Sequence, residues 1–505
     1  MKKIVIVGAG TAGLAAAAMM KSYWGEKVDI TLIYDKSRGN ISVGESTTPI
    51  FRLLLSHLGV STKQLIKDIG GKATIKLGIN FKNWIPNTEY FHGFAEVEQE
   101  IGTNTSAIYS IPAGEFNGGM NYSKAVTTIP NKPFEEYGYA MHIDTKVFCE
   151  YITERLKNRI KFVDGVVNRV RVNPECNKIE HIECTSGIYE ADLFVDASGF
   201  NAVLFKHLNP TWHDTSNILP INRAIPQQVP YDFKETPAYT TCEATRNGWI
   251  WQIPIGDRFG TGYLYSSKFT TDEEAQKQYD KWLREKFDVG LETDRIIRYK
   301  PGYYEDYWIG NCLAIGLSSG FIEPLEATGI QIIIQQIQEF MIINSTLKNL
   351  EYNRRIVNKG NRTLYQDIID FVALHYCTNR TDSAFWNYMT YNKIDWVRDF
   401  EEKCKVEFLD GRTCYKEKTF WGLDSFIQVC YGLKMFDRES IKNFLLSKID
   451  GMDIFNQAQG EHELSLINIS EPTRRRLISS AVLGLKIGGR GGGGGGVGGG
   501  GVGGG

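Results

Sequence analysis

The sequence lacks long apolar runs, paired cysteine motifs and an excess of charge of one sign, and each absence excludes a class of protein. No run approaches the roughly 18–20 apolar residues of a membrane-spanning helix. The nine cysteines form no CxxC motif, and an odd, scattered set of thiols is typical of a reduced cytosolic protein. Lysine and arginine total 57 against 59 aspartate and glutamate, so no globally basic surface for nucleic acid is indicated.

Histidine is scarce as well. The eight histidines include no HExxH motif and no clustered ligand spacing, so we expect no metal site. The amino-terminal MKKIVIVGAG has only four apolar residues before its first glycine, which indicates a strand rather than a secretory signal. With 505 residues, 42% of them hydrophobic, the chain is long enough for two or three domains with large cores. We therefore expect a soluble, cytoplasmic protein.

A glycine-rich turn near the amino terminus is the first positive signal. Ile4–Val7 predicts a buried strand, GAGTAG follows at residues 8–13, Leu14–Trp24 predicts a helix, and Val28–Tyr34 predicts a second strand. In such a βαβ unit a GxGxxG turn is typical of dinucleotide binding.

Each glycine of this fingerprint has a physical reason. Gly8 permits the tight turn, Gly10 lets the backbone approach a pyrophosphate, and Gly13 lets the helix pack on the strand. The start of the helix then carries the phosphate charge. Tyr34 occupies the place of the acidic residue that normally binds a ribose, so we expect Asp35, one residue later, to bind it.

A second segment indicates a flavin. Ala191–Gly199 (ADLFVDASG) predicts a buried strand that ends in a turn of small residues. Together with the single fingerprint it is typical of FAD-binding oxidoreductases of the glutathione-reductase-like kind, and a pure NAD dehydrogenase would usually lack it. The fold class we expect is α/β, with a Rossmann-like FAD module and a mixed, largely helical substrate module.

The rest of the chain is predicted more coarsely. In chain order we expect helices at Phe51–Leu58 and Lys146–Asn158, loops over 88–140, strands over about 215–300, a strand at Leu313–Gly316, a long apolar helix from Thr328, and helices from 346 to about 450. Fifteen of the 51 glycines lie in 488–505. The low-complexity segment 463–505 cannot bury enough surface to fold, and we expect it to be disordered and without function.

Several further motifs occur together. They are SVGESTTP at Ser42–Pro49, ATIKLGINFKNW at Ala73–Trp84, GWIWQIP at Gly248–Pro254, RFGTGYLYSS at Arg258–Ser267, PLEATG at Pro324–Gly329 and DFVALHYCTNRTDSAFW at Asp370–Trp386. The combination resembles the flavin-dependent halogenases of the tryptophan-halogenase type over about residues 1–435. WxWxIP, the lysine segment and PLExTG carry most of that resemblance. Whether the nearest relatives are viral members of the family, such as cyanophage proteins, stays open.

The resemblance implies a halogenation chemistry. A separate flavin reductase supplies FADH2 in trans, oxygen makes a flavin hydroperoxide, and a chloride, bromide or iodide ion attacks it to give hypohalous acid. The acid passes through a tunnel to a lysine, and an electron-rich indole or phenol is halogenated by electrophilic substitution. We expect a box-shaped FAD module of 1–90, 141–205 and 300–345, and a pyramid-shaped substrate module of 91–140, 206–299 and 346–462.

Lys76 and Glu326 match the catalytic pair of that family. An exposed amine with a pKa of about 10.4 is mostly protonated at neutral pH, whereas burial favours the neutral, nucleophilic form. A carboxylate can polarise the oxidant, stabilise the arenium cation or take its proton. The motif spacing favours neither Lys72 nor Lys82, and Glu323 is the rival of Glu326.

Thr328 and Gly329 match the halide site of the family. They begin the predicted long helix, whose free N–H groups attract an anion, although ordinary N-capping by Thr328 is an alternative. Trp249 and Trp251 match the pair thought to shield the flavin from the substrate, although core packing alone would also explain them.

The remaining site residues also follow from the resemblance. His92 and Phe94 match positions that sandwich the substrate ring, with loop packing as the alternative. Around the FAD we expect Gly8, Gly10, Thr11, Ala12, Gly13, Asp35, Val43, Glu45, Ser46, Val167, Leu317 and Ile330.

Two departures from the family pattern affect specificity. Ala327 replaces the serine of PLESTG, and we expect a looser halide site that favours bromide or iodide. The stretch Phe408–Trp421 is short for the family's lid, and the residues that would clamp a free amino acid are not evident. We therefore expect a more open site and a substrate other than free tryptophan, such as a simple indole or phenol.

Two other functions fit part of the sequence. An FAD-dependent aromatic monooxygenase shares the FAD module, but Lys76, Glu326 and WxWxIP argue against it. A non-catalytic flavin-binding protein is the second alternative, for which Ala327 and Tyr34 leave room. Halide dependence of the product distinguishes the three. Native substrate, regiochemistry, halide preference, partner reductase and oligomeric state stay open.

Overall fold

The structure is a computed structural model that describes residues 1–38, 45–94, 138–232, 236–346, 350–406 and 421–437. Val43, most of the segment 91–140, the stretch 408–420 and the tail 463–505, on which the sequence carries predictions, lie outside the described residues.

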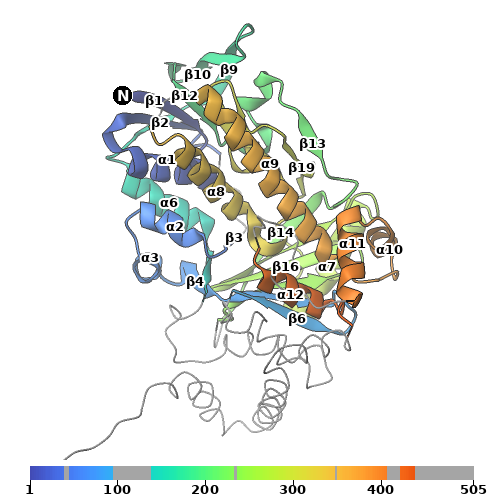
Figure 1. The fold of residues 1–505 in the computed structure, drawn as a ribbon. Coiled ribbons are helices and arrows are strands. Elements are labelled where there is room, and N and C mark those ends of the chain that lie inside the picture. The colour runs from blue at the N-terminus through green and yellow to red at the C-terminus, as the bar shows by residue number, and fades with distance from the viewer. Residues whose placement is uncertain (39–44, 95–137, 233–235, 347–349, 407–420, 438–505) are drawn as a thin grey trace, which may run out of the picture.

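A six-stranded sheet forms the first half of the molecule (Figure 1). Its order is β20 (Trp308–Ile309), β21 (Cys312–Ala314), β12 (Leu193–Asp196), β1 (Lys2–Val7), β2 (Val28–Tyr34) and β8 (Lys161–Asp164). All neighbours are parallel except β20 and β21. These strands are near-continuous apolar runs because both faces of a parallel sheet are covered.

Helices and a small sheet cover the two faces of this sheet. On one face the core contains residues of α1 (Thr11–Trp24), α2 (Phe51–His57), α6 (Thr145–Leu156) and α8 (Thr328–Ile343). On the other face lies the three-stranded sheet of β9 (Val167–Asn173), β10 (Lys178–Cys184) and β11 (Gly187–Tyr189). The predicted βαβ unit and the predicted helices at residues 51 and 146 are confirmed.

A seven-stranded sheet forms the second half. Its order is β18 (Ile297–Arg298), β14 (Arg223–Pro230), β17 (Arg258–Tyr265), β16 (Gly248–Ile255), β15 (Tyr239–Ala244), β5 (Gly78–Lys82) and β6 (Glu89–Gly93). Two small sheets flank the junction, β3 (Glu45–Ser46) with β7 (Ala140–Ile143) and β4 (Ala73–Lys76), and β13 (Trp212–Asp214) with β19 (Gly302–Tyr304) and β22 (Gly320–Phe321).

Four carboxy-terminal helices complete the described chain, namely α9 (Leu350–His375), α10 (Ala384–Tyr391), α11 (Asp395–Val406) and α12 (Leu423–Gly432). Helix α9 joins the two halves. Val357, near its start, belongs to the first core, whereas Tyr365 in its second half and Tyr376 just after it belong to the second core. The helix α3 (Thr62–Ile69) lies beside β4.

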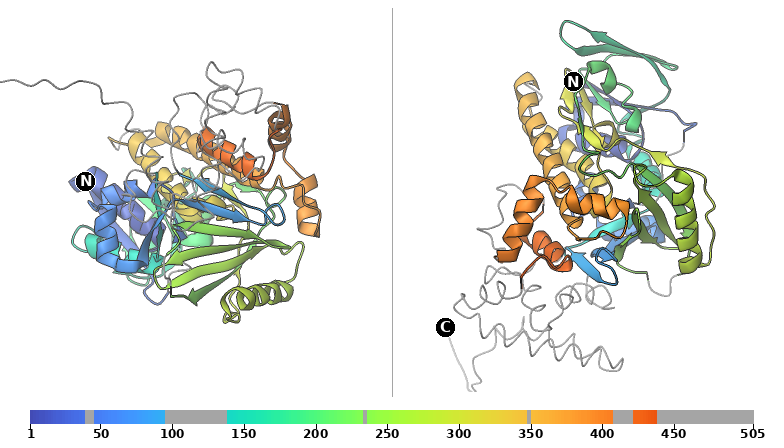
Figure 2. Two further views of the ribbon diagram at one scale, coloured as in Figure 1. Left: turned by 90° about the horizontal axis from the view of Figure 1, so that it is seen from below. Right: turned by 90° about the vertical axis from the view of Figure 1, so that its right-hand side faces the viewer.

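Helix α7 (Asp272–Phe287) interrupts the region predicted as strands. The side chain of Thr271 accepts a hydrogen bond from Glu274 N, and three acidic residues favour the first turn. The helix lies on the outer face of the seven-stranded sheet (Figure 2). Its Ala275, Tyr279 and Leu283 are buried there against residues of that sheet. The prediction missed these start signals because the strands on both sides dominate the composition.

The segment predicted as loops begins instead with the strand β6. Residues 78–93 pair as β5 and β6 with the second sheet, so the expected module boundary at residue 90 falls inside this sheet. Tyr90 and Phe91 are buried there in the second core. β6 forms a hairpin with its neighbour β5, and only the pairing of β5 with the distant strand β15 cannot be read from local composition.

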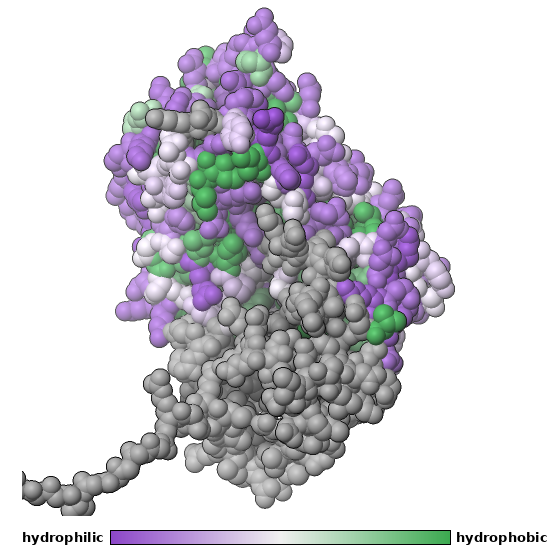
Figure 3. Space-filling view, in the orientation of Figure 1, coloured by the Kyte–Doolittle hydropathy of each residue, from purple (hydrophilic) through white to green (hydrophobic). Residues whose placement is uncertain are grey.

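On the coloured part of the face in Figure 3, hydrophilic residues predominate and the apolar residues form separate areas. In the part of the chain that the structure describes, no helix is long and apolar enough to span a bilayer.

Candidate active site

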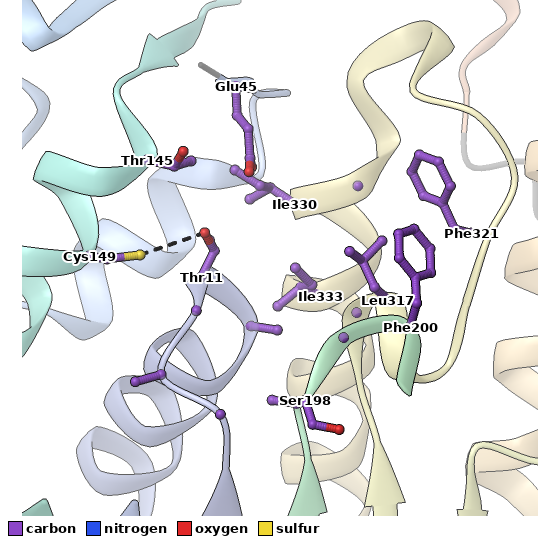
Figure 4. A pocket seen from close by; sticks show the side chains of 18 of the residues that line it. Thr11, Glu45, Thr145, Cys149, Ser198, Phe200, Leu317, Phe321, Ile330 and Ile333 are labelled. Carbon is purple, nitrogen blue, oxygen red and sulfur yellow. Dashed lines mark hydrogen bonds between the residues drawn. The ribbon is translucent and has the colours of Figure 1, made fainter. Parts of the chain in front are cut away.

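A cavity of about 1600 Å³ lies between the two large sheets. The loops after β1, β2 and β12 form one wall, and the inner faces of β15 and β16 form another. The first turns of α1 and α8 also border it (Figure 4). The cavity therefore opens at the carboxyl ends of parallel strands, where α/β folds bind their ligands.

The glycine-rich turn borders this cavity at the start of α1. Gly8 has a φ of +111°, and a Cβ there would lie 2.3 Å from the carbonyl oxygen of Ala197. A Cβ at Gly13 would lie 1.9 Å from the carbonyl oxygen of Gly8, so only glycine lets the helix approach. A Cβ at Gly10 would meet nothing within 4 Å, and no side chain caps the helix. The turn leaves open space and unpaired N–H groups at the same point.

Most of the residues expected around FAD line the cavity. These are Gly8, Gly10, Thr11, Ala12, Asp35, Glu45, Ser46, Val167, Leu317 and Ile330. Gly13 instead packs against Gly8. Asp35 accepts hydrogen bonds from the backbone and side chain of Ser37 and forms an ion pair with Arg38, and the bonds from Ser37 lower its pKa.

Sequence reasoning missed several residues of the wall. Phe200, Tyr299 and Phe321 form an aromatic group, in which the ring centroids of Tyr299 and Phe321 are 4.9 Å apart. Thr11 Oγ1 lies 3.8 Å from Cys149 Sγ (Figure 4). No motif pointed to the three aromatic residues or to Cys149, because they come from segments far apart in the chain. Thr11, by contrast, belongs to the predicted glycine-rich turn.

Lys76 ends β4 and is completely buried. Its Nζ donates a hydrogen bond to the carbonyl oxygen of Thr47 at 2.9 Å and lies 4.8 Å from the centroid of the Phe94 ring. Burial lowers its pKa from 10.5 to about 8, although Glu326 opposes the shift. A substantial fraction of this amine is therefore neutral near pH 8. Lys72, by contrast, pairs with Asp257 in a more exposed position.

Glu326 lies between two histidines in the core. His92 Nδ1 is 2.9 Å from both carboxyl oxygens, and His375 Nε2 is 2.9 Å from Oε1. Burial alone would raise the pKa of Glu326, but the charge of His92 and the hydrogen bonds from both histidines hold it well below its usual range. Glu326 is therefore a fixed negative charge.

A hydrogen bond of His375 assigns one of its protons. Nδ1 lies 2.8 Å from the carbonyl oxygen of Phe371, which can only accept, so Nδ1 carries a hydrogen. Its Nε2 faces the carboxylate of Glu326 at 2.9 Å. His92 Nε2 bonds Ser425 Oγ, which can donate or accept, so Nδ1 of His92 can donate to Glu326.

Glu323, the rival carboxylate, faces a different group. Its Oε1 accepts hydrogen bonds from Trp249 Nε1 at 3.2 Å and Tyr376 OH at 2.8 Å. Burial raises its pKa to about 7, with these two bonds opposing the shift. His375 and Tyr376, adjacent in sequence, therefore contact the two glutamates separately. Neither was predicted, although both lie in the quoted DFVALHYC motif.

The start of α8 brings an unusual backbone to the cavity. Glu326 and Ala327 have φ values of 65° and 58°, in the left-handed region, which is strained for residues other than glycine. The N-cap is Ala327, without a side-chain hydrogen bond, so Thr328 does not act as the cap. A Cβ at Gly329 would meet nothing within 4 Å, and Gly329 lines the cavity. The first N–H groups of α8 thus lack a side-chain cap.

Trp249 and Trp251 line the cavity from β16. His92 is buried, with both ring nitrogens bonded as described, and Phe94 lies beside Lys76. The role of His92 and Phe94 as a sandwich for a substrate ring stays a prediction.

Comparison with known proteins gives concordant results. The model of one family, described as tryptophan halogenase, matches residues 3–444. A tryptophan 6-halogenase of Streptomyces toxytricini is 29% identical over 82% of this chain and 86% of its own length. A tryptophan 7-halogenase of Lentzea aerocolonigenes is 30% identical over 76% and 78%. The solved structure of a flavin-dependent halogenase from Xanthomonas campestris has a TM-score of 0.80 at 25% identity, over 92% of this chain and 96% of that one.

Proposed function

Because this chain belongs to the tryptophan halogenase family and is a flavin-dependent halogenase, we propose that Lys76 and Glu326 direct its halogenation of an electron-rich aromatic ring. One observation carries the proposal. Lys76 is a buried lysine with a lowered pKa that feels the charge of Glu326, and Glu326 is a buried carboxylate held ionised by two histidines.

The cavity fits FAD. The open space at Gly10 and the uncapped start of α1 suit a pyrophosphate, and Asp35 suits a ribose hydroxyl. Glu45, Ser46, Val167, Leu317 and Ile330 would hold the rest, and Thr11 and Ala12 would add N–H groups. When bound, reduced flavin supplies the electrons with which dioxygen converts a halide to hypohalous acid.

The halide would bind at the start of α8. The N–H groups of Thr328 and Gly329 favour an anion, and the open space at Gly329 gives it room. With Ala327 in place of a hydroxyl-bearing residue, we expect bromide to be preferred to chloride at equal concentration. More chlorinated than brominated product at equal halide concentrations would contradict this preference.

Lys76 would receive the hypohalous acid. The neutral amine can donate a hydrogen bond to the acid or bond its halogen, and the carbonyl oxygen of Thr47 fixes the position of Nζ. Glu326 would stabilise the positive charge that develops on the ring. Its carboxylate stays ionised because His92 and His375 both contact it and hold its pKa below its usual range.

Trp249 and Trp251 would keep the aromatic substrate away from the flavin. Trp249 is held by Glu323, and both indoles form the cavity wall, which supports this role. The acid would pass this wall, whereas a substrate ring would not.

Two substrate classes remain in the proposal. The absence of an evident amino-acid clamp in 408–421 favours a simple indole or phenol. The names of the relatives favour tryptophan.

A separate flavin reductase would supply FADH2, as flavin-dependent halogenases require. The proposal also retains two modules, but assigns residues 78–93 to the substrate module because they pair with its sheet.

The test is a bromination assay with FAD, flavin reductase, NADH and bromide, on indole and on tryptophan. Mass spectrometry detects the bromine isotope doublet. We expect brominated indole, its loss in Lys76→Ala, and its retention in the matched variant Lys72→Ala, whose lysine pairs with Asp257 outside the cavity.

Three results would contradict parts of the proposal. Bromination that survives Lys76→Ala would remove Lys76 from the mechanism. Turnover of tryptophan well above that of indole would reject the open site. Hydroxylated product without bromine would indicate a monooxygenase.

A further inference from the structure

Cys242 lies on the wall of the cavity, on the strand next to the two tryptophans. In the antiparallel pair of β15 and β16 it stands directly opposite Trp251. Opposed residues point to the same face of a sheet. On this face Thr240 and Cys242 of β15, and Trp249, Trp251 and Ile253 of β16, all line the cavity.

The surroundings of Cys242 are those of the proposed reaction. The charges of Glu326 and Lys76 both act on its thiol, and the thiol in turn acts on Lys76. Beside it, Trp251 Nε1 is buried and has no hydrogen-bond partner among the described residues. Cys242 thus lies on the cavity wall and interacts electrostatically with the proposed catalytic pair.

We propose that the thiol of Cys242 is an internal target of the hypohalous acid made by this enzyme and is oxidised when no aromatic substrate consumes that acid. The inference rests on the proposed function, because the oxidant is the product of the flavin reaction. Nothing in the halogenation itself uses this cysteine.

The chemistry balances without a further reagent. The sulfur attacks the bromine of hypobromous acid, the O–Br bond breaks, and hydroxide leaves with the thiol proton as water. Water then displaces bromide from the sulfenyl bromide and gives a sulfenic acid and a proton. Sulfur loses two electrons and bromine gains them. A second equivalent gives the sulfinic acid, which is not reversed by thiols.

The environment makes the site selective. Burial first, and then the negative charge of Glu326, raise the pKa of Cys242 well above 9, so its thiol stays protonated. Protonated buried thiols resist mild oxidants and alkylating agents. We therefore expect oxidation by hypohalous acid formed beside it and resistance to added hydrogen peroxide.

Three other cysteines provide internal controls. Cys149 also lines the cavity, but its electrostatic neighbours are Glu45, Glu150 and Asp144 beside α1. Cys312 is buried in β21 away from the cavity wall. Cys176 is exposed and reports oxidant that has leaked into solution.

The experiment runs the holoenzyme with FAD, flavin reductase, NADH and bromide but no aromatic substrate. Catalase and free methionine in solution remove leaked oxidants. Mass spectrometry follows the tryptic peptide 235–246, in which Cys242 is the only cysteine. We expect a gain of one or two oxygen atoms there, dependent on bromide and suppressed by indole, with Cys149, Cys312 and Cys176 unchanged.

A variant completes the test. We expect Cys242→Ala to brominate indole at an initial rate within about twofold of the parent and to perform at least about twofold more turnovers before it inactivates. Inactivation with Cys242 unmodified, or equal oxidation without bromide, would overturn the inference while leaving the proposed function intact. Failure of the indole assay would overturn both.

Discussion

Lys76 lies in an environment that disfavours its charged form, and this has a measurable consequence. Its pKa is about 8 in the fold against 10.5 for a free lysine. Between these values the unfolded chain binds more protons than the folded one, so stability rises with pH. The full difference corresponds to about 3 kcal/mol.

The first prediction concerns this rise. We expect the parent protein to gain stability between about pH 8 and 10.5, and Lys76→Met to lack that gain while losing bromination. Thermal unfolding at pH 7.5 and pH 10 measures the difference. In Lys72→Met the gain should persist, because that amine is exposed and paired with Asp257. An equal gain in Lys76→Met would show that other groups cause it.

The second prediction concerns His375, a positioning residue that acts through Glu326. His375→Leu removes the hydrogen bond and the electrostatic contribution that lower the pKa of Glu326, so this pKa should rise and the carboxylate should protonate in weakly acidic buffer. We expect kcat to fall at least about tenfold at pH 6 and less at pH 8, with KM little changed. The pH profile of bromination measures this.

His375→Gln is the matched variant, since its amide can donate to Glu326 without charge. It should recover part of the activity at pH 8 and less at pH 6. A pH-independent loss in both variants would indicate a purely structural role for His375.

At the scale of elements, the turn from β1 into α1 separates two kinds of glycine. Gly13 holds the helix against the strand, whereas the space beside Gly10 is open. The same sequence motif therefore contains one position needed for packing and one available to a ligand.

The third prediction follows from that contrast. Gly10→Ala should change the stability of the FAD-free protein by less than about 1 kcal/mol but weaken FAD binding at least about tenfold. Gly13→Ala should lower stability without FAD by more than about 2 kcal/mol, because its Cβ would collide with the backbone of Gly8. Thermal unfolding without FAD and titration of flavin fluorescence measure the two effects. Equal effects of both changes on unfolding would contradict the assignment.

At the scale of the whole molecule, α9 and α12 connect the second core to the site. The side chains of Ser425 and Gln428 on α12 bond His92 and the backbone of Gly93. The family match ends at residue 444, before the glycine-rich tail.

The fourth prediction concerns that tail. Deletion of 463–505 should leave bromination and Tm unchanged, because a glycine tract cannot bury apolar surface. Deletion from residue 423, which also removes α12, should abolish bromination and lower Tm by several degrees. Comparison of both deletions by calorimetry and the indole assay measures this, and a loss of activity in the shorter deletion would give the tail a function.

Sequence reasoning succeeded where local patterns decide the conformation. Val28–Tyr34 and the start of α8 at Thr328 agree with their predicted positions, since strand and helix patterns are properties of neighbouring residues. It missed α7, although Thr271 and the acidic turn after it are recognisable start signals. It also read residues from 88 as loop, although β6 pairs with its neighbour β5, and only the further pairing of β5 with β15 depends on a distant segment.

The sequence by itself determined the family and the nucleotide fingerprint, and it singled out Lys76 and Glu326 as the candidate catalytic pair. Only the tertiary structure decided that Glu326 is held by His92 and His375, residues 234 and 49 positions away. It likewise decided that Cys242 faces the cavity. Local sequence sets the backbone of each element, but the partners of a buried side chain depend on how elements pack, and packing brings together residues that share no local pattern.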